Sequence, residues 1–136
     1  MTVLDTSGVV DFLVGEQCHA EVADLLRQEG SVAGPDLLVF EVVAVFRRQV
    51  KHHGISPDRA KSAIEDLGDL PLEIFPALPL RARVWELRDN FTAADAFFVA
   101  LAERLDEPLA TKDRRLGAAA RTYTSIQIIE LGSPGI

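Results

Sequence analysis

Short apolar segments that resemble strands alternate with longer helical segments along most of this chain, and this alternation limits the folds it can adopt. The sequence predicts strands at residues 2–5, 31–34, 72–75, 109–111 and 126–129. Helices are expected at 7–14, 17–29, 37–53, 57–70, 80–89 and 92–105. Parallel strands need long crossover connections, which the intervening helices provide. We therefore predict an α/β fold, a three-layer α/β/α sandwich with a mainly parallel central sheet.

Several predicted helices begin with recognisable capping residues. Ser56 and Pro57 are the expected N-cap and first-turn proline of one helix, and Asp36 is expected to cap the helix before it. Thr92 followed by Asp95 is a capping-box pattern. In parallel sheets, ligands bind beyond the carboxyl ends of the strands. Polar residues between a strand and the next helix are therefore the first candidates for a functional site.

Chain length and charge restrict the kinds of partner that the protein can bind. The 136 residues, 48% of them hydrophobic, suit one domain spanning 1–136. Because 14 Lys and Arg residues stand against 21 Asp and Glu residues, the net charge is -7. Such a chain has no protein-wide basic field to attract nucleic acid or an acidic membrane. Any polyanion must be bound at a local site.

The sequence carries no pattern of secretion or membrane insertion. Its first residues lack an early Lys or Arg, and Asp5 and Asp11 interrupt their apolar stretch. The longest apolar runs are far shorter than the roughly 20 residues that span a bilayer. Because Cys18 is the only cysteine, no internal disulfide can form, which fits a reducing compartment. We expect a soluble, cytoplasmic protein.

Asp5 and Glu41 are the first two candidate site residues. Asp5 ends the first predicted strand, where it can point into the crevice beyond the sheet or simply cap the next helix. Glu41 has apolar neighbours at helical spacing and no Lys or Arg in register for a salt bridge. Burying an unpaired carboxylate is costly or raises its pKa. Glu41 therefore needs a cation from another segment or a place at the rim of a cavity.

Asp95 and Asp113 complete the set of candidate carboxylates. Asp95 precedes an apolar run, AFFVALA, and the capping box with Thr92 would account for it, although a carboxylate at a helix start can also face a cleft. Asp113 follows the strand at 109–111, next to the hydroxyl of Thr111. The alternative for Asp113 is a surface ion pair with a neighbouring cation: Lys112, Arg114 or Arg115.

These four acids lie on four segments that the predicted sheet brings to one end. Two like charges roughly 4 Å apart repel by about 4 kcal/mol at an effective dielectric constant of about 20. A divalent cation removes this repulsion, and a site built from oxygen ligands suits Mg²⁺ or Mn²⁺ rather than Zn²⁺. We therefore predict a metal site formed by Asp5, Glu41, Asp95 and Asp113.

Other motifs are weaker candidates. His52 and His53 are adjacent, so one helix face cannot present both to a metal ion. Cys18 and His19 have no second pair of ligands, and the glycines form no phosphate-binding loop. The sequence therefore does not support a zinc site or a nucleotide site.

Four segments of the chain resemble the motifs of the PIN-domain nucleases, and most closely those of the VapC toxins of bacterial type II toxin–antitoxin pairs. The segments are, in order, VLDTSGVVDFL, PDLLVFEVV, FTAADAFFVALAERL and LATKDRRL. By this resemblance the acidic quartet is Asp5, Glu41, Asp95 and Asp113, and the supporting hydroxyl residues are Thr6, Ser7 and Thr111. Many relatives carry further acids where this chain has Phe98, Val99 and Arg115, so a second metal site would lack those ligands.

The resemblance implies an endoribonuclease that uses Mg²⁺ or Mn²⁺ and inhibits growth until a cognate VapB-like antitoxin blocks it. Asp5 and Asp95 would be the principal metal ligands, Glu41 a ligand or water orienter, and Asp113 a second-metal or outer-shell ligand. A metal-activated water would hydrolyse the phosphodiester bond and leave 5′-phosphate and 3′-hydroxyl ends. The resemblance also implies a homodimer whose paired sites share a groove.

RNA binding by a chain of net charge -7 requires cations gathered in one place. Three clusters are present: Arg47, Arg48 and Lys51; Arg81, Arg83 and Arg88; and Lys112, Arg114 and Arg115. The first two clusters can equally be solvated helix faces. We expect only the third to adjoin the acidic site, so its members are the candidate RNA-binding residues.

Two other functions remain open. A catalytically silent PIN-fold module would bind RNA or protein without cleavage, although the presence of all four carboxylates favours an active enzyme. A Mg²⁺-dependent phosphotransfer receiver domain also groups acids, Thr and Lys at strand ends, and Thr111 with Lys112 is a partial match. Such a domain usually has two adjacent acids after its first strand, whereas Thr6 follows Asp5 here. Chelator-sensitive RNA cleavage separates the nuclease from the module, and acetyl-phosphate labelling would reveal a receiver.

Overall fold

The computed structural model describes residues 1–132. Within them one five-stranded sheet has the order β3-β2-β1-β4-β5, and every neighbouring pair is parallel. The strands are β1 (Val3–Leu4), β2 (Val32–Pro35), β3 (Leu72–Phe75), β4 (Leu109–Thr111) and β5 (Ile128–Glu130). The predicted parallel sheet is confirmed.

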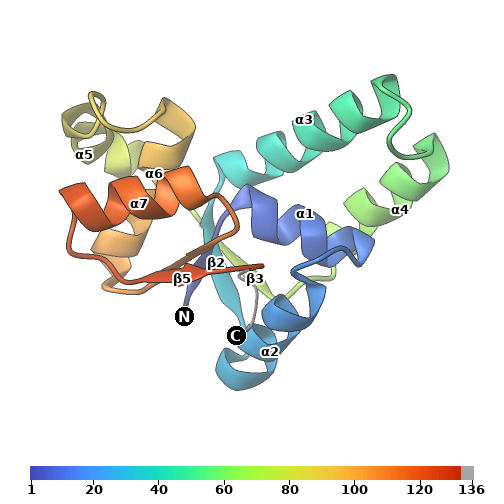
Figure 1. Cartoon of the computed structure of the whole chain (residues 1–136), viewed down its shortest axis with the longest axis horizontal. Coiled ribbons are helices and arrows are strands. Elements are labelled where there is room, and N and C mark those ends of the chain that lie inside the picture. Colours follow the sequence, from blue (N-terminus) through green and yellow to red (C-terminus); the bar gives the residue numbers. More distant parts are fainter. Residues whose placement is uncertain (133–136) are drawn as a thin grey trace.

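Helices provide the crossover connections between these strands. The connections from β1 to β3 contain α1 (Thr6–Val14), α2 (His19–Glu29), α3 (Leu37–Lys51) and α4 (Pro57–Leu67). The connections from β3 to β5 contain the 3₁₀ turn η1 (Leu78–Leu80), α5 (Arg81–Glu86), α6 (Ala93–Leu105) and α7 (Arg114–Tyr123). Figure 1 shows α1 to α4 on one side of the sheet and α5 to α7 on the other. The three-layer α/β/α fold is therefore confirmed.

The core lies on both faces of the sheet. Val3, Leu4, Val32 and Leu109 of the central strands are all 0% exposed. Strands covered on both faces are apolar at successive positions and do not alternate with polar residues. The central strands of this sheet follow that pattern. Phe98 of α6 is 2% exposed. Burial of such side chains contributes roughly 1.5–3 kcal/mol each and fixes the helices against the strands.

The direction in which successive strands are added to the sheet reverses at β1. The chain first moves outward from β1 to β2 and β3, and then returns to place β4 on the other side of β1. The carboxyl ends of β1 and β4 therefore lie side by side, and the backbone N–H of Asp5 donates to the carbonyl of Ala110 at 3.2 Å. A crevice beyond the strand ends at such a reversal is where ligands bind in sheets of this kind.

Helix α7 is absent from the elements that the sequence predicts. Its sequence, RRLGAAARTY, contains a narrow apolar stripe in which Leu116, Gly117 and Ala120 are buried. Residues 80–89, expected to form one helix, instead form the end of η1, the short α5 and part of the turn that follows it. The last strand begins two residues later than expected, at Ile128.

The predicted caps are confirmed in two of three cases. The Ser56 and Thr92 side chains accept hydrogen bonds from the backbone N–H groups of Arg59 and Asp95. The predicted cap by Asp36 is wrong, because its backbone is already helical (φ -61°, ψ -24°) and its side chain makes no capping bond. Among the helices of residues 1–132, none has the length and apolar character needed to cross a bilayer.

Candidate functional site

Asp5 follows β1, and its side chain is buried, with 6% of the residue exposed. Its Oδ1 accepts hydrogen bonds from Ser7 Oγ at 2.7 Å and from the backbone N–H of Gly8 at 3.2 Å. Its Oδ2 accepts one from Thr111 Oγ1 at 2.5 Å. Asp5 therefore caps α1, as the simpler interpretation expected, and also lies at the crevice, as the functional interpretation required.

Glycine at position 8 lets α1 begin directly over β1. A Cβ atom at this position would lie 2.5 Å from Leu4 Cδ1 and 2.9 Å from Leu131 Cδ1, well inside van der Waals contact. The missing side chain lets the first turn of α1 pack directly against Leu4 and Leu131. The Gly8 N–H donates to Asp5 because Asp5 is the N-cap residue of α1.

The environment of Asp5 disfavours its charged form. Burial, with a smaller contribution from the charge of Asp95, raises the pKa of Asp5 to about 6, although the hydrogen bonds from Thr111, Ser7 and Gly8 act to lower it. A nearby cation stabilises the charged form of a carboxyl group in such an environment. Burial is thus the main reason why the charged form of Asp5 is disfavoured.

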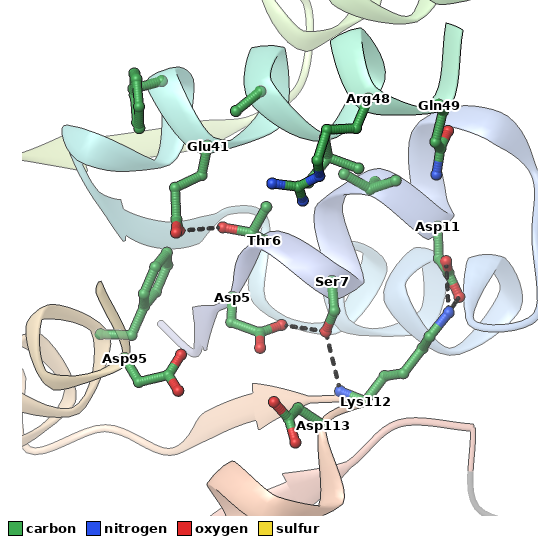
Figure 2. Close-up of a pocket in the computed structure, with 15 residues that line it drawn as sticks. Asp5, Thr6, Ser7, Asp11, Glu41, Arg48, Gln49, Asp95, Lys112 and Asp113 are labelled. Atoms are coloured by element: carbon green, nitrogen blue, oxygen red, sulfur yellow. Dashed lines mark hydrogen bonds and ion pairs between the residues drawn. The ribbon is translucent and has the colours of Figure 1, made fainter. Parts of the chain in front are cut away.

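Glu41 extends from α3 toward Thr6, whose hydroxyl donates to Glu41 Oε1 at 2.6 Å. Figure 2 shows this contact across the cavity from Asp95 and Asp113. Glu41 is partly buried and makes no ion pair within residues 1–132. The sequence predicted a cation from another segment or a place at the rim of a cavity for Glu41. The structure shows the second, and the hydrogen-bond partner of Glu41 is the hydroxyl group of Thr6.

Asp95 and Asp113 reach the same place from the starts of α6 and α7. Burial raises the pKa of Asp95, and the charges of Asp113 and Glu41 raise it further, against the hydrogen bond with Thr92. Asp113 Oδ1 caps α7 by accepting from the backbone N–H groups of Arg115 (2.9 Å) and Leu116 (3.2 Å). Within residues 1–132 it forms no ion pair, so the surface salt bridge considered for it is not observed.

All four carboxylates line one cavity of about 500 Å³, together with Thr6 and Ser7. Figure 2 shows these six residues around the cavity. Thr111 stands behind Asp5 and supports it. The lining residues contribute neither histidine nor cysteine, so the donor chemistry fits a hard cation such as Mg²⁺ or Mn²⁺. In the part of the chain described, no group of three or more Asp, Glu, His or Cys side chains is already arranged to hold a metal ion.

Lys112 lines this cavity but is already paired with a buried acid. Its Nζ contacts the two carboxylate oxygens of Asp11 at 2.9 and 3.0 Å, and Asp11 is 5% exposed. This hydrogen-bonded ion pair raises the pKa of Lys112. Asp11 was not among the predicted site residues, although an acid inside the apolar run VVDFLV was a signal that it had a partner.

The other predicted cations are distributed differently from the expectation. Arg115 lines a smaller neighbouring cavity that shares Asp95 and Asp113 with the acidic one, whereas exposed Arg114 lines neither. Arg48, from the first predicted cluster, does line the acidic cavity. The expectation that only the cluster at 112–115 adjoins the acids was therefore wrong, because the face of α3 that carries Glu41 also carries Arg48.

Residues 2–122 match the family model of the PIN domain. Ribonuclease VapC1 of Mycobacterium tuberculosis is 39% identical over 128 residues, covering 93% of this chain and 96% of the relative. Ribonuclease VapC12 of the same organism is 33% identical over 129 residues, covering 95% and 99%. The chain therefore belongs to the PIN-domain family, among the proteins named VapC ribonucleases, as its four motifs predicted.

Solved structures show the same fold. PAE2754 from Pyrobaculum aerophilum has a TM-score of 0.71 at 17% identity, covering 93% of this chain and 81% of that chain. VapBC2 from Rickettsia felis, solved bound to a DNA fragment from their promoter, gives 0.70 at 14% identity, covering 96% and 98%. At these identities the likeness concerns the arrangement of helices and strands.

Proposed function

We propose that this chain is an endoribonuclease dependent on Mg²⁺ or Mn²⁺ and the toxin of a toxin–antitoxin pair. The observation that carries the proposal is the meeting of Asp5, Glu41, Asp95 and Asp113 at one cavity beyond the strand ends. Relatives named ribonuclease VapC, matched over nearly their whole length, support RNA as the substrate.

The proposed cofactor fits the donors that the chain offers. Asp5 and Asp95 would be the principal ligands, with Glu41 as a ligand or water orienter and Asp113 as an outer or second-metal ligand. The raised pKa values of Asp5 and Asp95 support this assignment. Burial and negative neighbours disfavour the charged form of each carboxyl group, and a bound cation would offset that cost. When bound, the ion would supply Lewis-acid activation of the phosphate and of the attacking water.

The protein's own side chains would orient the reacting groups. Ser7, Gly8 and Thr111 hold both oxygens of Asp5, and Thr6 holds one oxygen of Glu41. Hydrogen bonds of this kind reduce the freedom of the carboxylates before substrate binds. Glu41, at the rim of the cavity, would orient a water molecule for in-line attack, which would leave 5′-phosphate and 3′-hydroxyl ends.

The proposed protein partners are a VapB-like antitoxin and a second copy of this chain. The solved VapBC2 structure, named for both components, supports the first. Exposed apolar side chains of α3 support contact with protein in general, since Phe40, which also lines the acidic cavity, is 73% exposed and Val39 is 45% exposed. We also propose that the protein acts in the cytoplasm, where its RNA substrates are found.

Cleavage of RNA by the purified protein tests the enzymatic proposal. We expect cleavage of a mixed-sequence RNA with Mg²⁺ or Mn²⁺, its loss with a chelator, and its loss in Asp95→Asn. Asp106→Asn is the matched control, because Asp106 is an exposed acid at the opposite end of α6 with φ 53°, which Asn also tolerates. Undiminished cleavage by Asp95→Asn would refute the assignment, and RNA binding without cleavage under any divalent ion would favour the silent module.

A second experiment tests the toxin role in cells. Brief induction of the protein should generate new RNA ends, and the Asp5→Asn variant should generate none. Co-expression of a cognate antitoxin should suppress both the new ends and the growth arrest. Identical RNA profiles before and after induction would contradict the toxin role.

A further inference from the structure

Two cations line the acidic cavity, and the structure places them in different electrostatic states. The ammonium group of Lys112 is held by both carboxylate oxygens of Asp11 and is thereby neutralised. The guanidinium group of Arg48 makes no hydrogen bond or ion pair with any other residue in the range 1–132. Of the two, Arg48 is the cation that remains available to an incoming anion.

Arg48 lies on the same face of α3 as Glu41, two helical turns further along. Residues seven apart share a helix face, and the separation corresponds to about 10 Å along the axis. Ala44 and Val45, which lie between them, line the same cavity. Figure 2 shows the Arg48 side chain reaching from α3 into the cavity on the side of Glu41 and Thr6. The α3 face thus presents an acid at one point of the cavity and an arginine at another.

We propose that Arg48 binds a backbone phosphate of the RNA, next to the phosphate that is cleaved. This inference rests on the proposed ribonuclease function and assigns a substrate contact within it. The planar fork of arginine pairs with phosphate through two parallel hydrogen bonds, whereas a lysine acts as a point charge. A chain of net charge -7 needs such local cations to hold a polyanion. In this proposal Arg48, which begins two helical turns from Glu41 on α3, contributes to RNA binding and not to bond cleavage.

Lys112 then acts as a positioning residue. Its backbone N–H donates to Ser7 Oγ at 3.2 Å, and Ser7 in turn donates to Asp5. The ion pair with Asp11 ties the turn after β4 to α1. Lys112, the cation next to Asp113 in the sequence, is therefore held in an ion pair within the protein. Arg48, two helical turns from Glu41, is left to bind the substrate.

Arg47 provides a matched control for Arg48. It is the residue just before Arg48 on the same helix and is also exposed. However, it lines the separate groove between α3 and α4, with Val50 and Ile64. Arg47→Gln and Arg48→Gln remove the same charge from adjacent positions and from different faces of α3. A general electrostatic effect would change RNA binding equally in both variants.

Fluorescence anisotropy with a labelled, mixed-sequence single-stranded oligoribonucleotide measures the contact, in an Asp95→Asn background that prevents cleavage. We expect Arg48→Gln to weaken binding by about tenfold and to reduce the slope of log affinity against log salt by about 0.7. Arg47→Gln should leave both values near those of the parent, and Arg48→Lys should restore part of the affinity. In the active enzyme, Arg48→Gln should raise KM with little change in kcat.

Equal binding losses in the Arg47 and Arg48 variants would overturn the inference, as would a fall in kcat with RNA affinity unchanged. Circular dichroism of both variants should match the parent, because both side chains are exposed. The outcome is separable from failure of the proposed function. If the wild-type protein cuts RNA while Arg48→Gln behaves like Arg47→Gln, the ribonuclease proposal stands and only the assignment of Arg48 fails.

Discussion

The hydroxyl group of Thr111 donates a 2.5 Å hydrogen bond to Oδ2 of Asp5, a residue 106 positions earlier in the chain. The same Thr111 oxygen accepts a hydrogen bond from the backbone N–H of Asp113 at 3.0 Å. One buried hydroxyl thus joins the carboxyl end of β1 to the turn after β4. Two of the four candidate carboxylates owe their relative position to this contact.

Replacing Thr111 by valine keeps the shape of the side chain and removes the hydroxyl. We predict that Thr111→Val lowers the free energy of unfolding by about 1–3 kcal/mol, because the buried Asp5 carboxylate loses a donor. Chemical denaturation measures the loss. Thr122→Val is the control, since the Thr122 hydroxyl donates to the Ala118 carbonyl on an exposed helix surface, and its loss should stay within about 0.5 kcal/mol. Equal stability of the two variants would contradict the role given to Thr111.

The pKa of Asp5 predicts how the stability of the metal-free protein depends on pH. The folded-state pKa is about 6, above the ordinary value of 3.8. Between these two values the folded protein keeps a proton that the unfolded chain releases, so the free energy of unfolding falls as pH rises from about 4 to about 6. The contribution is fully present below this window and lost above it, with a size of at most about 3 kcal/mol.

Denaturation across this pH range, with a chelator present, measures the effect as the difference between wild type and Asp5→Asn. The variant lacks the titrating group, so the wild-type stability should fall relative to it as pH rises. Adding Mg²⁺ or Mn²⁺ should reduce the difference in slope, because the ion stabilises the charged carboxylate. Parallel stability curves for the two proteins would show that Asp5 does not titrate in this window.

The ion pair between Asp11 and Lys112 should matter more than an ion pair on the open surface. Lys112→Met leaves the Asp11 carboxylate, 5% exposed, without its cation, and we predict a loss of about 2 kcal/mol after allowance for the partial exposure of Lys112. The double variant Asp11→Asn with Lys112→Met should lose less than the sum of the single changes.

Arg27→Gln is the control for this prediction. Arg27 pairs with Asp24 one helical turn away, and both side chains are mostly exposed. The expected cost is less than about 0.5 kcal/mol. Thermal or chemical unfolding of the four variants gives the comparison, and a Lys112→Met protein as stable as Arg27→Gln would disprove the anchoring role.

The central part of the fold could be predicted because its signals are local. Residues 72–75 and 109–111 were predicted as strands with the bounds that the structure shows, since each is a short apolar run between clear breaks. The position of Asp5 followed from the rule that ligand sites lie at strand ends. Glu41 was identified because its helical neighbours offered no partner. The cavity gathers these carboxylates, while their catalytic roles stay predictions.

The features that were missed depend on tertiary contacts. Helix α7 was missed although its buried residues, Leu116, Gly117 and Ala120, lie at helical spacing, because its start is set by Asp113, which was considered only as a ligand or a surface acid. In the sequence, Arg48 could equally belong to a solvated helix face, whereas Lys112 was predicted to adjoin the acids as a candidate RNA-binding residue. Their different states depend on Asp11 reaching across from α1 to one of them, and no spacing along the chain reveals a contact between residues 101 positions apart.

Titration of the purified protein with Mn²⁺, followed by electron paramagnetic resonance, tests most directly whether the gathered carboxylates hold a hard divalent ion. We predict saturable binding by the wild-type protein, weakened at least about tenfold in both Asp5→Asn and Asp95→Asn and unchanged in Asp106→Asn. Equal Mn²⁺ affinity in all four proteins would contradict the account, because the ion would then be held elsewhere or only loosely attracted to the acidic surface.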